Sequence, residues 1–489
     1  YTDTIERVLN RYCEIYEDVL RFCEETENWS EESKFRYMVE ESWSIKHFIE
    51  KIDKEKRQKL SKYIKEGRIE IPALFGNQIS GMCGHEELIR LMYPSFRISR
   101  EFGAEICSGS ITDIPGLSWG LPTVLSGAGI KFFFAGLPTY FQWGRNDIHT
   151  FWDEDNILRK HGRPDAFYWQ GPDGSKVLVF YQGGYGCWSP QSYKQILREL
   201  PVMLDDMDQK GCPFSVMRYG GYGCGDNTRT DIVVSHLVKE WNNKWEYPKL
   251  IVGTNAMFFE KLSKQCDNVR TFIGELPHTD YAVGAMSSAK ETTINRNTHD
   301  RLNSAEKLAT MANLLIDRDY PADEIRNAYE CMLLYDEHTW GMAHQVGYIQ
   351  DWAWSEKSSY AYKSAGLTEI ILSNSARALA DSIPFDDENQ HIVVFNTLSF
   401  NRTDLVNMPF YRDDTFKLID TETGQEVTHQ ITKIDDPHLP ILYSAGRFAR
   451  GQFNSSELYN LAFVAENVPS MGYKTYKIIR SENKKNEHI

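Results

Sequence analysis

The sequence predicts an α/β fold, with a seven-stranded α/β barrel followed by a helical bundle and the start of a β-sandwich domain. Three observations lead to this prediction. Short β-rich runs alternate with helical stretches up to about residue 276, as expected for a mainly parallel sheet or barrel. Amphipathic segments with few glycines then continue to about residue 383, and β-rich segments with polar turns fill the remainder. We therefore predict domains over residues 1–276, 277–383 and 384–489, the last of them incomplete.

The predicted barrel domain begins with an amphipathic helix, because apolar side chains recur at helical spacing from Ile5 to Cys23. A parallel strand needs a crossover from the strand before it, so a helix this early implies a strand upstream of Tyr1. We therefore interpret the chain as a fragment that lacks the first strand of the barrel. Gly171-Pro-Asp-Gly174 predicts a turn ahead of a later strand. The seven runs predicted as strands are residues 35–39, 68–74, 104–111, 130–135, 177–181, 215–219 and 250–253.

The two later domains differ from the first in their patterning. The bundle region has long amphipathic segments, whereas the last region has short β-rich runs separated by polar turns and no convincing helix. The expected bundle helices are 302–316, 322–334 and 360–378, and the expected β segments are 391–395, 416–419, 461–465 and 473–479.

Composition excludes several classes of function. The chain has 489 residues, and its 54 Lys and Arg against 69 Asp and Glu give a net charge of -15, with no dense basic cluster, so a nucleic-acid partner is not expected. No run of about 18 apolar residues occurs, so no membrane span is expected. The nine cysteines include no Cys-x-x-Cys pair, which argues against a disulfide framework and favours a cytoplasmic location. A homo-oligomer is compatible with this composition.

Two aspartates follow predicted strands and are candidate catalytic residues. Asp113 comes directly after the run 104–111, and Asp226 lies in the glycine-rich loop after the run 215–219. Functional groups gather at the carboxyl ends of strands in α/β barrels, which favours a catalytic role for both carboxylates. A structural role stays open for each, because Asp113 could cap the next helix and Asp226 could form an Asx turn.

The segment Asp336-Glu-His-Thr-Trp-Gly341 ends a predicted bundle helix and brings an acid, an imidazole and an indole close together. Packing alone hardly explains such a cluster, although a histidine at a helix end is often a cap. Carboxylates and a histidine from distant segments suit either metal-assisted hydrolysis or glycoside hydrolysis by a carboxylate pair. Glu86 and Glu87 with Arg90 are weaker candidates, since a solvated helix face explains them equally well.

The order of these and other short motifs resembles glycoside hydrolase family 38, the α-mannosidases, in a divergent bacterial-type subgroup. Each motif alone is weak, but their shared order covers nearly the whole chain and is specific. The motifs are Glu41-Ser-Trp43, Gly67-Arg-Ile-Glu-Ile71, the Asp113 loop, and the segments 167–174, 222–227, 274–276, 336–341, 394–402 and 468–474. Aromatic residues make up 13% of the chain, a content suited to stacking on sugars, and the substrate-binding candidates among them are Trp43, Trp169, Tyr222 and Trp340.

The resemblance implies a retaining mechanism, in which one carboxylate attacks the anomeric carbon and a second carboxylic acid protonates the leaving oxygen. Asp113 matches the nucleophile, and Asp226 matches the acid/base. The residue after the aspartate is Ile114, and the loop reads Asp-Ile-Pro-Gly where the family usually has an aromatic residue after an Asp-Pro pair. This departure bears on the sugar-stacking surface.

The resemblance also implies one Zn²⁺ ion, which in this family holds the 2- and 3-hydroxyls of the sugar. Its ligands would be Asp113, a bundle histidine and a His-x-Asp pair at the end of the first strand. His338 matches the bundle ligand, with Asp336 and His344 as alternatives. The His-x-Asp pair would lie just upstream of Tyr1, so we expect this chain alone to bind the metal weakly and to have little activity.

The expected function is therefore zinc-dependent, retaining hydrolysis of terminal α-mannosides through an aspartyl glycosyl-enzyme, with an oligosaccharide or another glycoside as substrate. Two alternatives remain. A metal-dependent carbohydrate deacetylase on a related barrel would need a metal-bound water and usually a His-x-x-x-His pair, which the sequence lacks. The second alternative is a carbohydrate-binding relative without catalytic activity. The presence of both Asp113 and Asp226 argues against this alternative.

Overall fold

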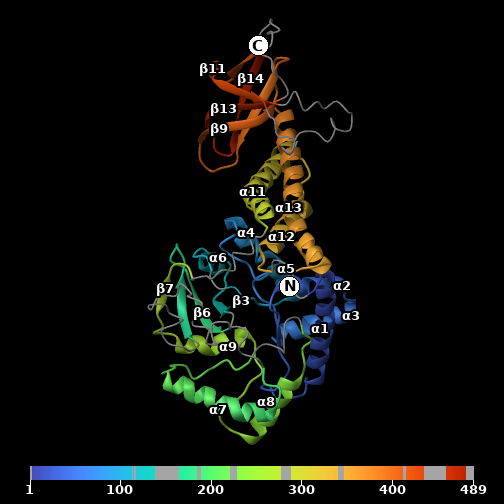
Figure 1. Ribbon diagram of the computed structural model, residues 1–489, viewed down its shortest axis with the longest axis vertical. Coiled ribbons are helices and arrows are strands. Elements are labelled where there is room, and N and C mark those ends of the chain that lie inside the picture. The colour runs from blue at the N-terminus through green and yellow to red at the C-terminus, as the bar shows by residue number, and fades with distance from the viewer. Residues whose placement is uncertain are drawn as a thin grey trace. The chain divides into compact units, whose positions relative to one another are not determined.

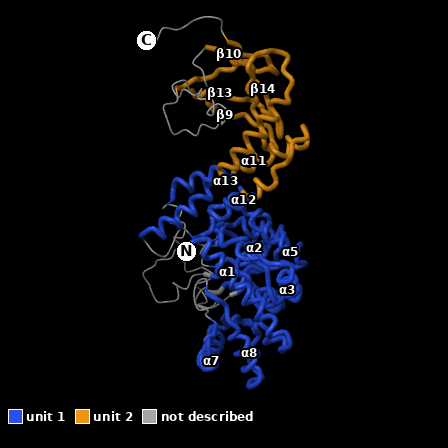
Figure 2. Tube along the Cα trace, turned by 90° about the vertical axis from the view of Figure 1, so that its right-hand side faces the viewer, with its two compact units in different colours: residues 1–299, 328–364 blue, residues 300–327, 365–489 orange. Residues whose placement is uncertain are grey.

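The computed structural model describes residues 3–112, 114, 117–137, 165–183, 189–220, 228–276, 288–339, 346–410, 415–433 and 459–480. The chain divides into two compact units, shown in different colours in Figure 2. Unit 1 comprises residues 1–299 and 328–364, and unit 2 comprises residues 300–327 and 365–489. The division into three domains stays a prediction.

Unit 1 contains a five-stranded sheet in the order β3-β4-β6-β5-β7. Figure 1 labels three of its strands, β3, β6 and β7. Neighbouring strands of this sheet pair in parallel except β5 and β6, which form an antiparallel hairpin. A second, two-stranded parallel sheet joins β1 to β2. The strands are β1 (Tyr37–Met38), β2 (Ile69–Glu70), β3 (Ser108–Thr112), β4 (Phe132–Leu137), β5 (Asp165–Gln170), β6 (Lys176–Gly183) and β7 (Thr271–Ile273).

Helices cover both faces of the larger sheet. Adjacent residues of β4 enter different apolar clusters: Phe133 packs with α6, whereas Phe134 packs with α9. This alternation is typical of a sheet that is buried on both faces. The helices of unit 1 before residue 288 are α1 (Ile5–Glu25), α2 (Ser42–Lys51), α3 (Lys54–Lys65), α4 (His85–Arg90), α5 (Tyr93–Phe102), α6 (Leu121–Gly127), α7 (Tyr193–Gln209), α8 (Val233–Lys244), α9 (Asn255–Leu262) and the 3₁₀ helix η2 (Ser263–Gln265).

Two runs predicted as strands, 215–219 and 250–253, are not strands in the structure. Other groups occupy their backbone hydrogen bonds. The amide of Ser215 donates to Gln265 Oε1 at 2.8 Å, and the amide of Val252 donates to the carbonyl of Glu32 at 2.8 Å. The guanidinium of Arg36 donates to the carbonyl of Val252 at 2.9 Å. Local β propensity was present at both runs, but within the part of the chain that the structure describes neither run pairs with a neighbouring strand.

Three long helices contribute to both units: α11 (Ala289–Ile316), α12 (Ala322–Asp336) and α13 (Tyr348–Asp381). They contain the three predicted bundle helices, which are therefore confirmed as helical segments. Among the described residues, no helix is both long enough and apolar enough to cross a membrane.

The β-rich part of unit 2 forms two antiparallel sheets, in the orders β11-β10-β14-β8 and β12-β13-β9. Side chains from both sheets share one apolar cluster, with Leu418 and Tyr476 from the first and Leu461 and Phe463 from the second. All four predicted β segments fall within these strands. The strands are β8 (Gln390–Asn396), β9 (Arg402–Phe410), β10 (Phe416–Asp420), β11 (Glu426–Val427), β12 (His429–Lys433), β13 (Tyr459–Val468) and β14 (Gly472–Arg480).

A largely buried ion pair joins two strands of the first of these sheets. Lys474 Nζ of β14 lies 2.7 Å from Asp420 Oδ2 at the end of β10, and both side chains are about 90% buried. Burial alone would raise the pKa of Asp420, but hydrogen bonds from Lys474 and from the backbone amides of Glu422 and Thr423 lower it. The pair therefore stabilises the fold whenever Asp420 is ionised.

We expect Asp420→Asn to destabilise these strands by about 2 kcal/mol at pH 7, because Lys474 loses its charged partner. The folded-state pKa is depressed, so this stabilisation is present above the unfolded-state value of about 3.9 and is lost as pH falls through the lower folded-state pKa. Hydrogen exchange of peptides from β10 and β14 measures the difference. Equal protection of variant and wild type at pH 7, or a difference that grows below pH 4, would contradict the prediction.

Candidate active site

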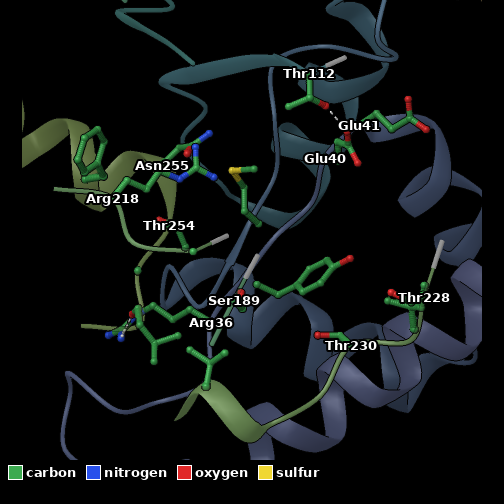
Figure 3. A pocket seen from close by; sticks show the side chains of 18 of the residues that line it. Arg36, Glu40, Glu41, Thr112, Ser189, Arg218, Thr228, Thr230, Thr254 and Asn255 are labelled. Atoms are coloured by element: carbon green, nitrogen blue, oxygen red, sulfur yellow. Dashed lines mark hydrogen bonds between the residues drawn. The ribbon is translucent and has the colours of Figure 1, made fainter. Parts of the chain in front are cut away.

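A cleft of about 1830 Å³ opens in unit 1. The carboxyl ends of three strands contribute to its wall: Glu40 and Glu41 follow β1, Asn77 and Gln78 follow β2, and Thr112 ends β3. Figure 3 shows Glu40, Glu41 and Thr112 together in this cleft, with Arg36 and Arg218 on other parts of its wall. The carboxyl ends of parallel strands are where α/β proteins place binding and catalytic groups, so this cleft is the candidate active site.

The end of β3 is held by a hydrogen-bond network at the cleft wall. The amide of Thr112 donates to Asn77 Oδ1 at 3.1 Å, and Asn77 Nδ2 donates to Glu40 Oε1 at 3.1 Å. The hydroxyl of Thr112 donates to the same carboxylate oxygen, as the dashed line in Figure 3 marks. Glu40, Asn77 and Thr112 thus fix the backbone that leads into residue 113.

Glu337 and His338, directly after α12, face the same cleft. His338 Nδ1 lies 2.6 Å from Glu337 Oε1, and the amide of His338 donates to the carbonyl of Asn77 at 3.1 Å. Gly76 separates Glu337 from Glu41: a Cβ atom added there would lie 3.4 Å from Glu337 Cγ and 3.7 Å from Glu41 Oε2. A Cβ at position 76 would therefore lie in van der Waals contact with both side chains.

These two carboxyl groups have opposite pKa shifts. Burial raises the pKa of Glu41 well above its ordinary value, and the negative charges of Glu337 and Glu40 raise it further. Burial also acts to raise the pKa of Glu337, but the neighbouring charges of His338 and Lys357 outweigh it and lower the pKa. The cleft therefore favours the protonated form of Glu41 and the ionised form of Glu337, whose carboxylate lies beside His338.

Lys357 of α13 secures the segment that carries Glu337. Its Nζ donates to the carbonyls of Leu334 and Glu337, both at 2.7 Å, and lies 3.5 Å from Glu337 Oε2. Burial lowers the pKa of Lys357, while Glu337 and Asp336 act in the opposite direction. The ammonium group caps the end of α12 and balances the charge of Glu337.

We expect Lys357→Met to lower the free energy of unfolding by about 3 kcal/mol, because it leaves two helix-end carbonyls and a buried carboxylate with fewer partners. Lys363→Met, at an exposed position of the same helix, is the matched control and should change stability by less than about 0.5 kcal/mol. Tryptophan fluorescence can follow urea unfolding, since the 12 tryptophans all lie between residues 29 and 354. Equal midpoints for the two variants would refute this role.

Only some of the predicted site residues line the cleft. His338 and Trp43 line the cleft. Asp336 is fully buried and does not line the cleft, so it is separated from His338 although only two positions away. Asp113, Asp226, Tyr222, Trp340 and His344 lie outside the described residues.

The prediction that Trp169 contacts the substrate needs a correction. Its side chain is fully buried in the core of unit 1, near the ring of Phe133, and its Nε1 donates to the carbonyl of Gly274 at 2.8 Å. It does not line the cleft. A ring enclosed in this way packs the sheet and has no face available for stacking on a sugar, which argues against the predicted substrate contact.

Sequence reasoning did not single out Glu40, Asn77, Glu337 or Lys357 as site residues. Glu40 had a usable signal, because it follows a predicted strand directly, and Glu337 lies inside the motif that contains His338. Asn77 and Lys357 carry no local signal, since their roles depend on contacts with residues 35 and 20 positions away.

The donor set around His338 fits the metal that the family implies. A metal-binding histidine usually gives its second ring nitrogen to a carboxylate, which fixes the ring and raises its basicity. Glu337 provides this partner for Nδ1 of His338. His338 is thus suited to zinc, whereas Asp336 has no access to the cleft.

Comparisons with known proteins agree with this architecture. The family model for the glycosyl hydrolases family 38 N-terminal domain matches residues 1–281, more than half of the chain. The α-mannosidases 2C1 of Homo sapiens and Mus musculus are 24% and 23% identical over 315 residues, which is 63% of this chain and 27% of each relative. The chain therefore matches only about a quarter of the length of these relatives.

Two solved structures share the fold. An α-mannosidase from Enterococcus faecalis V583 has a TM-score of 0.72 at 16% identity, over 100% of this chain and 56% of that chain. A protein of glycosyl hydrolase family 38 from Enterococcus faecalis has a TM-score of 0.65 at 16% identity, over 99% of this chain and 53% of that chain. The matched model places the chain in a family of glycoside hydrolases, and the two solved structures agree with its fold. The chain belongs to glycoside hydrolase family 38 and is α-mannosidase-like.

Proposed function

We propose that the full-length protein is a zinc-dependent, retaining glycoside hydrolase that cleaves terminal α-mannosides. The observation that carries this proposal is the match of the family model over residues 1–281, which include the cleft residues Glu40, Asn77 and Thr112. The two curated relatives are α-mannosidases, which supports a mannoside as the substrate class. A seven-stranded barrel and a β-sandwich remain part of the proposal, as does a cytoplasmic location.

In the proposed mechanism Asp113 attacks the anomeric carbon and forms a glycosyl-enzyme, while Asp226 protonates the leaving oxygen. Asp226 then removes a proton from water, which attacks the glycosyl-enzyme and releases the sugar with retained configuration. Glu40 and Asn77 support this assignment, because their hydrogen bonds hold Thr112, the residue before Asp113. Trp43, Tyr222 and Trp340 are the proposed contacts with the sugar.

The zinc ion would be held by Asp113, His338 and the His-x-Asp pair expected upstream of Tyr1. When bound, it supplies positive charge that orients the sugar hydroxyls and offsets charge in the transition state. Glu337 keeps the imidazole of His338 in position, and Lys357 keeps Glu337 in position.

Hydrolysis of an aryl α-mannoside by the full-length protein tests the proposal. We expect activity that a chelator removes and that added zinc restores, because the sugar hydroxyls lose their electrostatic partner when the metal leaves. Retention of configuration can be read from the anomer that is released first. Release of acetate from acetylated sugars without α-mannoside hydrolysis would return the function to the deacetylase alternative. Binding of mannosides without any turnover would favour a non-catalytic relative.

A further inference from the structure

A second group of side chains that could bind a metal ion lies close to the end of α12, but does not line the cleft. Cys83 precedes α4, Glu87 lies on α4, His299 lies on α11, and Asp336 ends α12. None of the four lines the cleft, and Glu87 and Asp336 are 1% and 0% exposed. This buried cluster therefore cannot contact a substrate in the cleft, and the proposed mechanism does not use it.

Three of the cluster's donor atoms approach the spacing of a tetrahedral zinc site. Zinc binds nitrogen and oxygen at about 2.0 to 2.2 Å, which puts neighbouring ligand atoms about 3.3 to 3.6 Å apart. His299 Nε2 lies 3.1 Å from Glu87 Oε2 and 3.3 Å from Asp336 Oδ2. Ligand atoms of Cys83, Glu87 and Asp336 lie within 4.8 Å of one another. His299 Nε2 thus adjoins both carboxylates of this group, and side-chain movements that bring it and Cys83 Sγ closer together would place four donors around one ion.

Neighbouring groups orient these donors. The amide of Gly84 donates to Glu87 Oε2 at 3.0 Å, and Asn295 Nδ2 donates to Asp336 Oδ2 at 2.9 Å. Position 84 packs tightly against His299, because an added Cβ would lie 3.2 Å from the histidine Cβ and the ring would have to shift by a few tenths of an ångström. Such outer contacts are what fixes the geometry of ligands in metal sites.

The cluster also has buried oxygen atoms that lack a donor. Glu87 Oε1, Asp336 Oδ1 and Asn295 Oδ1 are enclosed and have no hydrogen-bond partner when both carboxyl groups are ionised. Two enclosed carboxylates side by side need either a proton or a cation between them. A proton between the two carboxyl groups is the alternative to a metal ion, because burial and the negative charge of Asp336 raise the pKa of Glu87.

We propose that Cys83, Glu87, His299 and Asp336 bind a structural zinc ion, separate from the metal of the cleft. The mixture of thiolate, imidazole and carboxylate donors is typical of zinc, and four protein ligands leave no position open for catalysis. Zinc binding displaces the proton of the Cys83 thiol and any proton between the carboxyl groups. The ion would join α4, α11 and the end of α12, and so hold the segment that carries Glu337 and His338.

Cobalt substitution tests this site independently of hydrolysis. The full-length protein is stripped with a chelator and reloaded with Co²⁺ alone. We expect the near-ultraviolet charge-transfer absorption of a cobalt thiolate, since the cleft site has no cysteine among its proposed ligands. Cys83→Ser should abolish this absorption, and Glu87→Gln should weaken Co²⁺ binding at this site by at least about tenfold.

Cys107→Ser is the matched control, because Cys107 is also half-buried and its pKa is raised by burial and by Glu70 and Glu105. This variant and His338→Ala should both keep the absorption. Far-ultraviolet circular dichroism verifies that each variant is folded, and Cys83→Ala replaces Cys83→Ser if the latter is not. Absence of the absorption in the cobalt-loaded wild type, or its persistence in folded Cys83→Ser, would overturn the proposal and leave a shared proton as the occupant.

Discussion

Full-length protein carrying Asp113→Ala is expected to hydrolyse aryl α-mannosides at least about 10⁴-fold more slowly than the wild type. The proposed nucleophile forms the glycosyl-enzyme, so its removal eliminates the covalent route altogether. The structural reason for assigning this position lies in the residue before it. Thr112 ends β3 at the cleft wall, where Asn77 and Glu40 hold its amide and hydroxyl. Steady-state kinetics with an activated aryl leaving group measure the loss.

A matched control separates this effect from a general loss of cleft charge. Asp231 also lines the cleft, but its carboxylate accepts a hydrogen bond from the amide of Val233 at the start of α8. Asp231→Asn keeps an acceptor for that amide and should leave the rate within about twofold of wild type. Comparable activity of Asp113→Ala and Asp231→Asn would refute the assignment of the nucleophile.

Local pattern was sufficient to predict much of the fold. The apolar stripe from Ile5 to Cys23 predicted α1, β3 overlaps a predicted run, and β4 falls on a continuous apolar run, as burial on two faces demands. The run 250–253 is also apolar but is not a strand, since Glu32 and Arg36 take its hydrogen bonds. Whether an extended run joins a sheet depends on its neighbours, which the sequence of the run does not encode.

The sequence predicted which segments contribute to the candidate site. It did not predict which side chains contact one another there. The motif at residues 336–341 was recognised, yet adjacent side chains diverge: Glu337 and His338 line the cleft, whereas Asp336 is buried with Glu87. The sequence shows only the neighbours of Glu87 along its own helix, and these are typical of a solvated helix face. The residues that bury it, His299 and Asp336, lie more than 200 positions away.

His338→Ala in the full-length protein is expected to weaken zinc binding in the cleft by more than about 100-fold and to reduce α-mannoside hydrolysis accordingly. Loss of an outer-shell partner of a ligand already costs about 10- to 100-fold in affinity, and loss of the ligand itself removes one of the bonds to the metal. Zinc titration followed by activity, at increasing zinc concentrations, measures both effects.

Two further variants separate metal binding from positioning. Glu337→Gln retains the imidazole but replaces the carboxylate that holds Nδ1, so it should weaken zinc binding by only about 10- to 100-fold and excess zinc should restore much of the rate. His236→Ala removes an exposed histidine that contacts Trp29 and does not line the cleft, so it should match the wild type. If His338→Ala instead bound zinc in the cleft as tightly as His236→Ala, the bundle ligand would have to be another residue. Asp336 is turned away from the cleft, so that result would transfer the role to His344.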